Sequence, residues 1–327
     1  MAYDIVTFGA AVQDVFLQGK LFTPKREDDG DLVEEFELGS KNEIDNVTFS
    51  IGGGATNAAV TFARQGMKCA YFGYVGNDMA GEAVKHDLNQ NEVDNTLVHY
   101  SDKLSTGYSA LLLAPGGERT ILTYRGASSH FEIMDGELDT LNTRWFYLSS
   151  LEGNFEVIEK IILHAKSKSI SVAWNPGKKE LSDIEKLKPL LHGCSVLSLN
   201  KEEMALIFEG DTKEKLAEKS AEVVKVSVVT DGPNGLAACD GSKVYSAGMY
   251  EDVPVVDRTG AGDAFCSGFV SAIARGLDIN KAITLGSANS TSVVGLIGAK
   301  DGILRENAPL HDMDISVNVL GKGESNV

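Results

Sequence analysis

The chain has 327 residues, which allows one large domain or two smaller ones and is enough to bury a sizeable core. It carries 30 Lys and Arg against 47 Asp and Glu, a formal net charge of −17. This acidity argues against nucleic-acid binding and against electrostatic docking to an anionic membrane, because both need clustered basic residues. An anionic ligand would need local groups that attract it against the overall field.

The sequence shows no clear signal peptide, membrane span or disulfide pattern. The apolar stretch 5–8 has no basic segment and no signal-peptide core before it. No window approaches about 18 uninterrupted apolar residues, so we expect no membrane-spanning helix. The four cysteines are far apart, form no C-x-x-C pair and have no histidine at metal-ligand spacing. We therefore expect reduced core cysteines and a cytoplasmic protein.

Apolar and β-branched runs bounded by Gly, Asn or Asp alternate with helix-like stretches. We predict strands at 4–9, 70–75, 107–113, 119–124, 144–149, 170–174, 195–199, 225–230, 235–239 and 243–247. We predict helices at 56–66, 154–168, 201–208, 213–222, 261–275 and 279–295. The alternation from about residue 130 to 295 indicates an α/β fold with a mostly parallel central sheet and helices on both faces.

Two regions depart from this alternation. Residues 12–52 hold short alternating segments around an acidic stretch, and residues 97–125 have the pattern of strands with a turn at 115–117. We interpret both as antiparallel additions that form a small β lid over one end of the main sheet. No repeat, low-complexity segment or proline-rich linker divides the chain, so we expect a single domain over 1–327 with a frayed tail from 321.

Three glycines at 52–54 precede an Ala-rich helix. A glycine-rich turn before a helix eases close packing, so alone it is weak evidence for a ligand site. Asn57 is more informative than the glycines. A polar amide in an otherwise apolar helix start is either a local backbone cap or a ligand contact.

The segment 230–235 follows the strand-like run 226–229. Its Pro-Asn-Gly sequence is typical of a β-turn. The alternative is a nucleotide loop at the carboxyl edge of a parallel sheet, where ligands bind in such folds. From these residues alone, the turn is the better interpretation.

The strongest chemical signal is DRTGAGDAF at 257–265. Apolar residues recur every four positions after it, so a helix with one buried face begins here. Gly260, Ala261 and Gly262 then lie at a helix start, where N–H groups lack intrahelical partners and the helix dipole attracts anions. The segment predicts an anion hole for phosphoryl transfer.

Asp263 lies in the first turn of this helix. A carboxylate there can be a cap or a partner of the helix dipole, worth under about 1 kcal/mol. Beside a phosphate cradle it can instead accept the proton of a substrate hydroxyl that attacks phosphorus, as a kinase requires. Spacing alone does not choose between the two roles.

Together these motifs resemble the ribokinase-like (PfkB) carbohydrate kinases. The resemblance covers roughly residues 5 to 300 and follows the family's order: a substrate-binding start at 9–14, the N-terminal signature at 52–66 (GGGATNAAVTFARQG), the N-x-x-E motif at 200–203, the nucleotide loop at 230–235 and the C-terminal signature at 257–269. It implies a three-layer ribokinase-like fold with a β lid. It also implies a nucleotide-dependent kinase that phosphorylates a sugar or a similar alcohol.

The resemblance also implies roles for individual residues, by position. Asp263 would be the general base, with the anion hole formed at 260–262. Asn200 and Glu203 would organise Mg²⁺ and its waters, and Asp257 and Thr259 match positions that help to bind a monovalent cation, usually K⁺. The implied ATP contacts are Thr230, Gly232, Gly235 and Asn289, and the implied sugar contacts are Asp14, Gly53 and Asn57.

Some residues keep a second interpretation. Asn200 ends a predicted strand, and Glu203 follows at a helical spacing that equally fits reciprocal capping of a helix; as a magnesium ligand it would supply a carboxylate. Asp231 beside a phosphate site is electrostatically unfavourable, so we expect it to point away or to act through water or metal.

Two departures from the family bear on the acceptor. Ribokinases usually have Lys at the position of Gly54, which weakens a ribose assignment. Arg125 ends a lid-like strand, and a similar Tyr-Arg pair occurs in 2-keto-3-deoxygluconate kinases. It could pair with a carboxylate or phosphate of the substrate, or form a surface ion pair.

We therefore expect ATP-dependent phosphorylation of a hydroxyl on a small, ribose- or fructose-like sugar. A nucleoside kinase and a sugar-acid kinase are the alternatives within the fold, and Arg125 discriminates the second. A non-catalytic ligand-binding protein is the alternative outside the enzymes. By resemblance, a homodimer through the lid is also expected.

Overall fold

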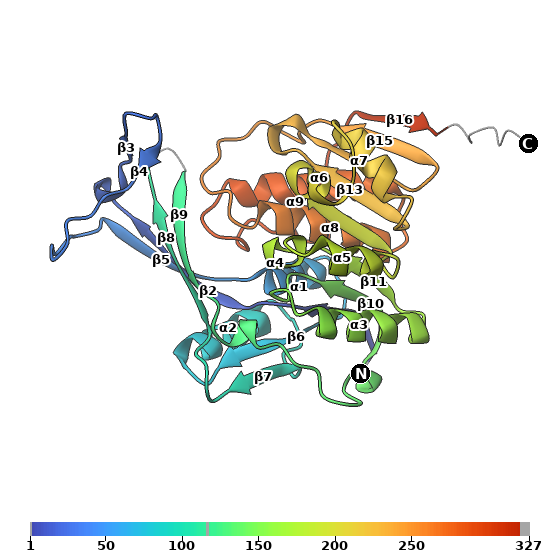
Figure 1. Cartoon of the computed structure of the whole chain (residues 1–327), viewed down its shortest axis with the longest axis horizontal. Helices are drawn as coiled ribbons and strands as arrows, with labels where there is room; N and C mark the ends of the chain where they lie inside the picture. Colours follow the sequence, from blue (N-terminus) through green and yellow to red (C-terminus); the bar gives the residue numbers. More distant parts are fainter. Residues whose placement is uncertain (1, 116–117, 321–327) are drawn as a thin grey trace, which may run out of the picture.

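A ten-stranded sheet runs through the body of the protein in the computed structural model, which describes residues 2–115 and 118–320 (Figure 1). In spatial order its strands are β16 (Ile315–Val319), β15 (Lys243–Ala247), β14 (Leu236–Cys239), β13 (Val226–Thr230), β12 (Val196–Asn200), β11 (Ser171–Trp174), β10 (Asn142–Leu148), β1 (Ala2–Phe8), β6 (Cys69–Gly76) and β7 (Val98–Ser101). Neighbours from β13 to β7 are parallel, and β14 to β16 are antiparallel additions at one edge. The expected mostly parallel sheet is confirmed.

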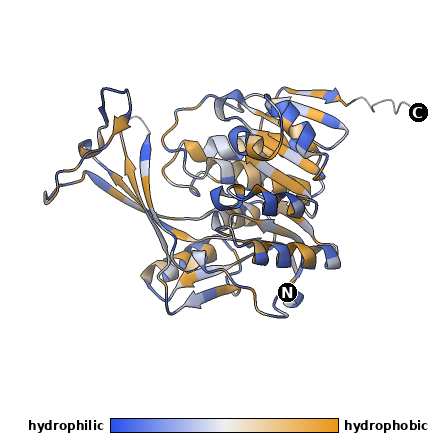
Figure 2. Ribbon diagram, in the orientation of Figure 1, coloured by the Kyte–Doolittle hydropathy of each residue, from blue (hydrophilic) through white to orange (hydrophobic). Residues whose placement is uncertain are grey.

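Helices pack on both faces of this sheet and make three layers. One face is covered by α1 (Gly54–Arg64), α2 (Met79–Gln90), α8 (Ala261–Ala274) and α9 (Ile279–Val294). The other is covered by α3 (Phe155–Lys168), α4 (Lys178–Leu181), α5 (Ile184–Leu191), α6 (Lys201–Ile207) and α7 (Lys213–Ser220). Because both faces are buried, consecutive strand residues such as Ile5 and Val6 enter opposite cores, and the strands of the body are largely hydrophobic (Figure 2).

A second sheet projects from the body (Figure 1). Its order is β5 (Asn46–Gly52), β2 (Val12–Gln18), β8 (Gly107–Leu113) and β9 (Arg119–Tyr124), and a short hairpin of β3 (Lys25–Arg26) and β4 (Leu32–Val33) lies beyond it. These strands fall within the two segments expected to form the lid. The segment 97–125 is not wholly lid, however, because β7 pairs with β6 in the large sheet.

The predicted elements agree with the observed ones to within about two residues at each end, but the short α4 and the edge strand β16 were missed, and so were the longer helices α2 and α5. Each has apolar residues at helical spacing, such as Val84 and Leu88 in α2, and each begins at an aspartate cap, Asp78 or Asp183. Interspersed charged and polar residues dilute that pattern in the sequence. The turn expected at 115–117 and the tail from 321 include residues outside the described ones.

All four cysteines are buried and unpaired, as expected for core thiols. Within residues 2–115 and 118–320, none of the helices combines the length and the apolar character needed to cross a bilayer.

Candidate active site

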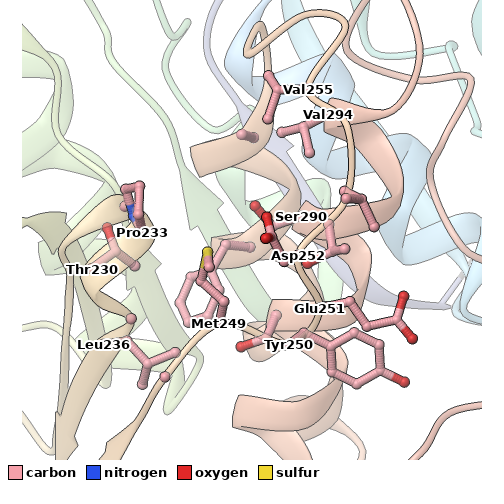
Figure 3. Close-up of a pocket in the computed structure, with 18 of the residues that line it drawn as sticks. Thr230, Pro233, Leu236, Met249, Tyr250, Glu251, Asp252, Val255, Ser290 and Val294 are labelled. Atoms are coloured by element: carbon pink, nitrogen blue, oxygen red, sulfur yellow. The ribbon is translucent and has the colours of Figure 1, made fainter.

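Two cavities meet near the carboxyl ends of the parallel strands. The larger, the apolar cavity of about 460 Å³, is lined by the β13–β14 turn, the segment 248–255 and residues of α8 and α9 (Figure 3). The smaller, the polar cavity of about 330 Å³, is lined by residues that include Gly54, Ser149, Lys178, Asn200, Glu203 and Asp263. Thr230 and Gly262 line both cavities, so a ligand in one can reach the other.

The start of α8 forms the border between the cavities. Gly260 caps the helix in the left-handed conformation (φ 77°), and a Cβ there would overlap Ala299. A Cβ at Gly262 would meet no atom within 4 Å, so this turn is open to the cavity. The first N–H groups of an α-helix have no intrahelical acceptor, and here they lie where an anion can approach them.

Asp263 and Asn57 join α8 to α1. The Asn57 amide nitrogen donates to the Asp263 carboxylate at 2.9 Å, so this side chain is not a backbone cap. Its oxygen, Oδ1, is buried without a hydrogen-bond partner among the described residues. Burial raises the pKa of Asp263, and the hydrogen bond from Asn57 opposes that shift. The carboxylate is therefore held in one orientation in an environment that increases its proton affinity.

Asp14, in β2, lies against the glycine turn that precedes α1. The missing side chain of Gly52 leaves room for the Asp14 carboxylate, and Gly53 (φ 100°) passes so close to Ala10 that a Cβ would overlap its carbonyl oxygen. Asp14 is 7% exposed. Burial raises its pKa to about 6, and the charges of Asp257 and Asp263 act in the same direction.

Asn200 and Glu203 cap α6 reciprocally. Asn200 Oδ1 accepts from the Glu203 N–H at 2.8 Å, and the Glu203 carboxylate accepts from the Asn200 N–H at 3.2 Å. Both residues also line the polar cavity, so the capping interpretation holds without excluding a ligand contact. No cluster of three or more His, Cys, Asp or Glu in the described part of the chain could hold a metal by itself. Mg²⁺ fits here only with phosphate and water ligands beside Glu203, which is its usual coordination.

The segment 230–235 is both a turn and a cavity wall. It joins β13 to antiparallel β14, and Gly235 (φ 82°) has no space for a side chain because a Cβ would overlap the Ala247 carbonyl. Thr230, Gly232 and Gly235 line the apolar cavity. Asp231 lies 3.9 Å from the Lys201 ammonium and lines neither cavity, so it points away from the site as expected.

Asp257 organises the loop before α8. Its Oδ1 accepts from the N–H and the hydroxyl of Thr259 at 2.9 and 2.7 Å, and its Oδ2 accepts from the Gly298 N–H at 3.0 Å. The Nε of Arg119, from lid strand β9, lies 3.8 Å from Oδ1. The loop that positions the start of α8 is therefore in contact with the lid.

A family model described as pfkB family carbohydrate kinase matches residues 29–305. The chain belongs to this family. The resemblance inferred from the motifs is thereby confirmed, and the chain is a sugar or nucleoside kinase with a phosphotransferase activity.

Related kinases differ in the acceptor that their names record. The ATP-dependent 6-phosphofructokinase of Thermoanaerobacterium thermosaccharolyticum is 26% identical over 90% of this chain and 92% of its own. The ribokinase of Haemophilus influenzae is 27% identical over 79% of this chain and 85% of its own. Among solved structures, Arabidopsis thaliana ribokinase with ribose and ATP has a TM-score of 0.77, 20% identity and coverage of 94% and 97% of the two chains, which shows the same fold.

Seven residues that were assigned to ligands from the sequence line neither cavity: Asp14, Gly53, Asn57, Arg125, Asp257, Thr259 and Asn289. Two of them, Asn289 and Arg125, have protein partners that argue against the assigned role. Asn289 is fully buried, donates to the Ala264 carbonyl and accepts from the Leu304 N–H, each at 2.8 Å, so its amide ties α9 to its neighbours. Its neighbour Ser290 lines the apolar cavity instead. Arg125 is half-exposed and pairs with Glu152 at 3.4 Å, which is the ion-pair alternative.

Three cavity residues escaped the sequence analysis. Lys178 brings an ammonium group to the polar cavity, Arg258 brings a guanidinium group to the apolar cavity, and Ser149 brings a hydroxyl beside Asp263. Each had a positional signal: Ser149 ends one predicted strand and Lys178 follows another at the ligand-binding edge of the sheet, and Arg258 lies inside the strongest motif.

Replacing Asp14 by Asn should stabilise the ligand-free kinase at pH 8 but not at pH 4.5. The pKa of Asp14 is raised from 3.8 to about 6 on folding, so its stabilising contribution is present below 3.8 and is lost as the pH rises through about 6. Above that pH the buried charge costs about 2–3 kcal/mol. Thermal unfolding of both proteins across this pH range, with the exposed Asp28→Asn as control, measures the difference. An equal effect at both pH values would contradict the burial argument.

Proposed function

We propose that this kinase transfers the γ-phosphoryl group of ATP to a hydroxyl of a small, neutral, ribose- or fructose-like sugar. The observation that carries the proposal is the 2.9 Å hydrogen bond that fixes Asp263 beside the open start of α8. The general base, Asp263, then lies next to the N–H groups that would bind the phosphoryl group. Phosphoryl transfer to an alcohol needs this arrangement.

In this mechanism Asp263 accepts the proton of the attacking hydroxyl as the oxygen approaches phosphorus. The raised pKa of Asp263, caused by burial, brings its proton affinity closer to that of an effective base near neutral pH. Asn57 holds the carboxylate in place. The N–H groups at 260–262 and the Lys178 ammonium stabilise the charge that develops on the transferred group.

The apolar cavity accommodates the nucleotide in this proposal. Thr230, Gly232 and Gly235 form one wall, and Arg258 lies where it can reach the phosphates. Glu203, with Asn200, would hold Mg²⁺ through its waters, and the ion supplies positive charge to the β- and γ-phosphates. Asp14, Gly53 and Asn57 face the acceptor.

The ion pair of Arg125 favours a neutral acceptor over a sugar acid. Glu152 already neutralises Arg125, and the acceptor side of the site carries the carboxylates of Asp14 and Asp263. A carboxylate on the substrate would be repelled by both of them, and Lys178, the cation that lines the polar cavity, is assigned here to the transferred phosphoryl group. A nucleoside acceptor has no such penalty and stays the second candidate.

The proposal is tested by measuring ADP release with ribose, fructose, nucleosides and keto-deoxy sugar acids as acceptors. We expect turnover with a neutral sugar. Turnover only with a nucleoside, or only with a sugar acid, would show that the acceptor belongs to that class and not to the neutral sugars. Binding of ATP without turnover of any acceptor would instead indicate a non-catalytic binding protein.

Replacing Asp263 by Asn should lower kcat by at least about 100-fold and leave both KM values nearly unchanged, because the amide keeps the shape but cannot accept the proton. Steady-state kinetics with the preferred acceptor measure this. Near-normal turnover of Asp263→Asn would exclude Asp263 as the base.

Removing cations should impair the kinase in two steps. Chelation of Mg²⁺ should abolish turnover, since one carboxylate and few basic groups face the phosphates. Replacing K⁺ by choline should lower the rate severalfold, because an ion at Asp257 and Thr259 would add to the positive charge that Arg119 already brings there. Equal rates in potassium and choline buffers would exclude the monovalent-cation effect.

We also propose that the lid sheet joins two copies of the chain. Phe49 and Leu122 are 65% and 60% exposed, and the strand register places them on the face opposite to Asp14. Tyr108 and Tyr124, paired across β8 and β9, extend the same apolar face. Burying it against a second copy would remove this surface from water and leave the acceptor side free.

The double substitution Phe49→Glu and Leu122→Glu should convert a dimer into a monomer, as measured by sedimentation. Val319→Glu, which changes an exposed apolar residue of β16, is the matched control and should leave the mass unchanged. A wild-type monomer at high concentration would contradict the proposed interface.

A further inference from the structure

Ser149 presents an unpaired hydroxyl to the polar cavity. The residue follows β10 directly, and its N–H donates to the Phe8 carbonyl at 3.0 Å, which fixes the backbone. The side chain belongs to a residue that is only 7% exposed, and it lines the polar cavity. Within the described ranges, no hydrogen bond is made by its Oγ. The hydroxyl is thus held at the cavity wall without a protein partner.

Glycines surround Ser149 and set the position of its hydroxyl. A Cβ placed on Gly54 would overlap Ser149 Oγ and would lie 3.2 Å from Asp263 Oδ1. A Cβ on Gly9 would lie 3.0 Å from the Ser149 Cβ. Only glycine at position 54 leaves room for the Ser149 hydroxyl. The Ser149 hydroxyl and the Asp263 carboxylate both lie next to the space that a side chain at position 54 would occupy.

The surroundings determine which chemical group fits beside this hydroxyl. A bound ligand that pairs with the Ser149 hydroxyl gains one hydrogen bond at the wall of the polar cavity. The nearby carboxylates of Asp263 and Asp14 disfavour an anionic group. Asn57 Oδ1 is buried without a partner among the described residues and needs a donor near Asp263, the carboxylate to which the Asn57 amide nitrogen donates. A neutral hydroxyl, which donates and accepts, satisfies both requirements.

We propose that Ser149 is a specificity-determining residue whose Oγ hydrogen bonds to a second hydroxyl of the acceptor, close to the hydroxyl that attacks phosphorus. Gly54 leaves the space for this contact. The inference rests on the proposed function, and it adds that the acceptor is a polyol at its reacting end. Any charged or apolar part of the acceptor lies farther from Asp263.

The first experiment combines Ser149→Ala with deoxy analogues of the preferred acceptor. The substitution should lower kcat/KM for the acceptor by about tenfold, the effect of one lost hydrogen bond, and leave the KM for ATP and the thermal midpoint unchanged. Wild type should discriminate against one deoxy analogue by a similar factor. Ser149→Ala should not discriminate against that analogue, because the partner of its missing hydroxyl is gone.

Ser150→Ala is the matched control for the deoxy experiment. Its hydroxyl already donates to the Glu180 carboxylate at 2.9 Å, so the variant should keep the wild-type discrimination between the acceptor and its deoxy analogues. Loss of discrimination in Ser150→Ala, and not in Ser149→Ala, would overturn the assignment of Ser149.

A second pair of variants tests the fit between Gly54 and Ser149. Gly54→Ala should lose most acceptor turnover, since its Cβ would displace the hydroxyl. Gly54→Ala combined with Ser149→Gly should recover to the level of Ser149→Gly alone, so the effects are not additive.

The outcomes separate this inference from the proposed function. An active wild type with unchanged kcat/KM and unchanged deoxy discrimination in Ser149→Ala would overturn the role of Ser149 and leave the kinase assignment intact. Wild type that binds ATP and phosphorylates no acceptor would overturn the proposed function, and the inference with it.

Discussion

The hydrogen bond between Asn57 and Asp263 is the contact on which the site depends. It links two helix starts that are 206 residues apart in sequence, and one turn farther on the Ser267 hydroxyl donates to the Thr61 hydroxyl at 2.8 Å. These two polar contacts fix the register of α1 against α8. A slip of either helix would leave buried polar groups unpaired, which is costly. The carboxylate of Asp263 therefore has one orientation relative to both cavities.

This arrangement explains how an acidic chain can handle an anionic substrate. The net charge of −17 is distributed over the whole molecule, and at physiological ionic strength charges beyond about 8 Å are largely screened. The groups that matter are local: the open N–H groups at the start of α8, Lys178 in the polar cavity and Arg258 in the apolar cavity. Each cavity thus has one basic side chain, but Glu251 and Asp252 line the apolar cavity and Glu203 and Asp263 the polar one, so phosphate binding there needs the helix N–H groups and added cations as well.

Much of the fold could be predicted from sequence, because parallel strands buried on both faces give continuous apolar runs and the helices between them show a clear period. The start of α8 was predictable for a similar reason. A glycine-rich segment that follows an extended run and precedes apolar residues at helical spacing is nearly always the turn that begins a helix. Side-chain direction was not predictable. Asn289 faces the interior and Ser290 the cavity, a difference of one residue that sequence does not record. Ser149 escaped notice because a lone serine after a strand becomes informative only when the glycines around it are seen.

In the proposed function, the contact between Arg119 and Asp257 would make the binding of the two substrates thermodynamically dependent on each other. Arg119 belongs to the lid strand β9, whereas Asp257 holds the loop that leads into α8, so one contact joins the acceptor side to the phosphate side. A ligand that favours the lid position in which this contact forms also favours the loop geometry that binds phosphate. Linkage then requires that the acceptor tightens ATP binding by the same factor by which ATP tightens binding of the acceptor.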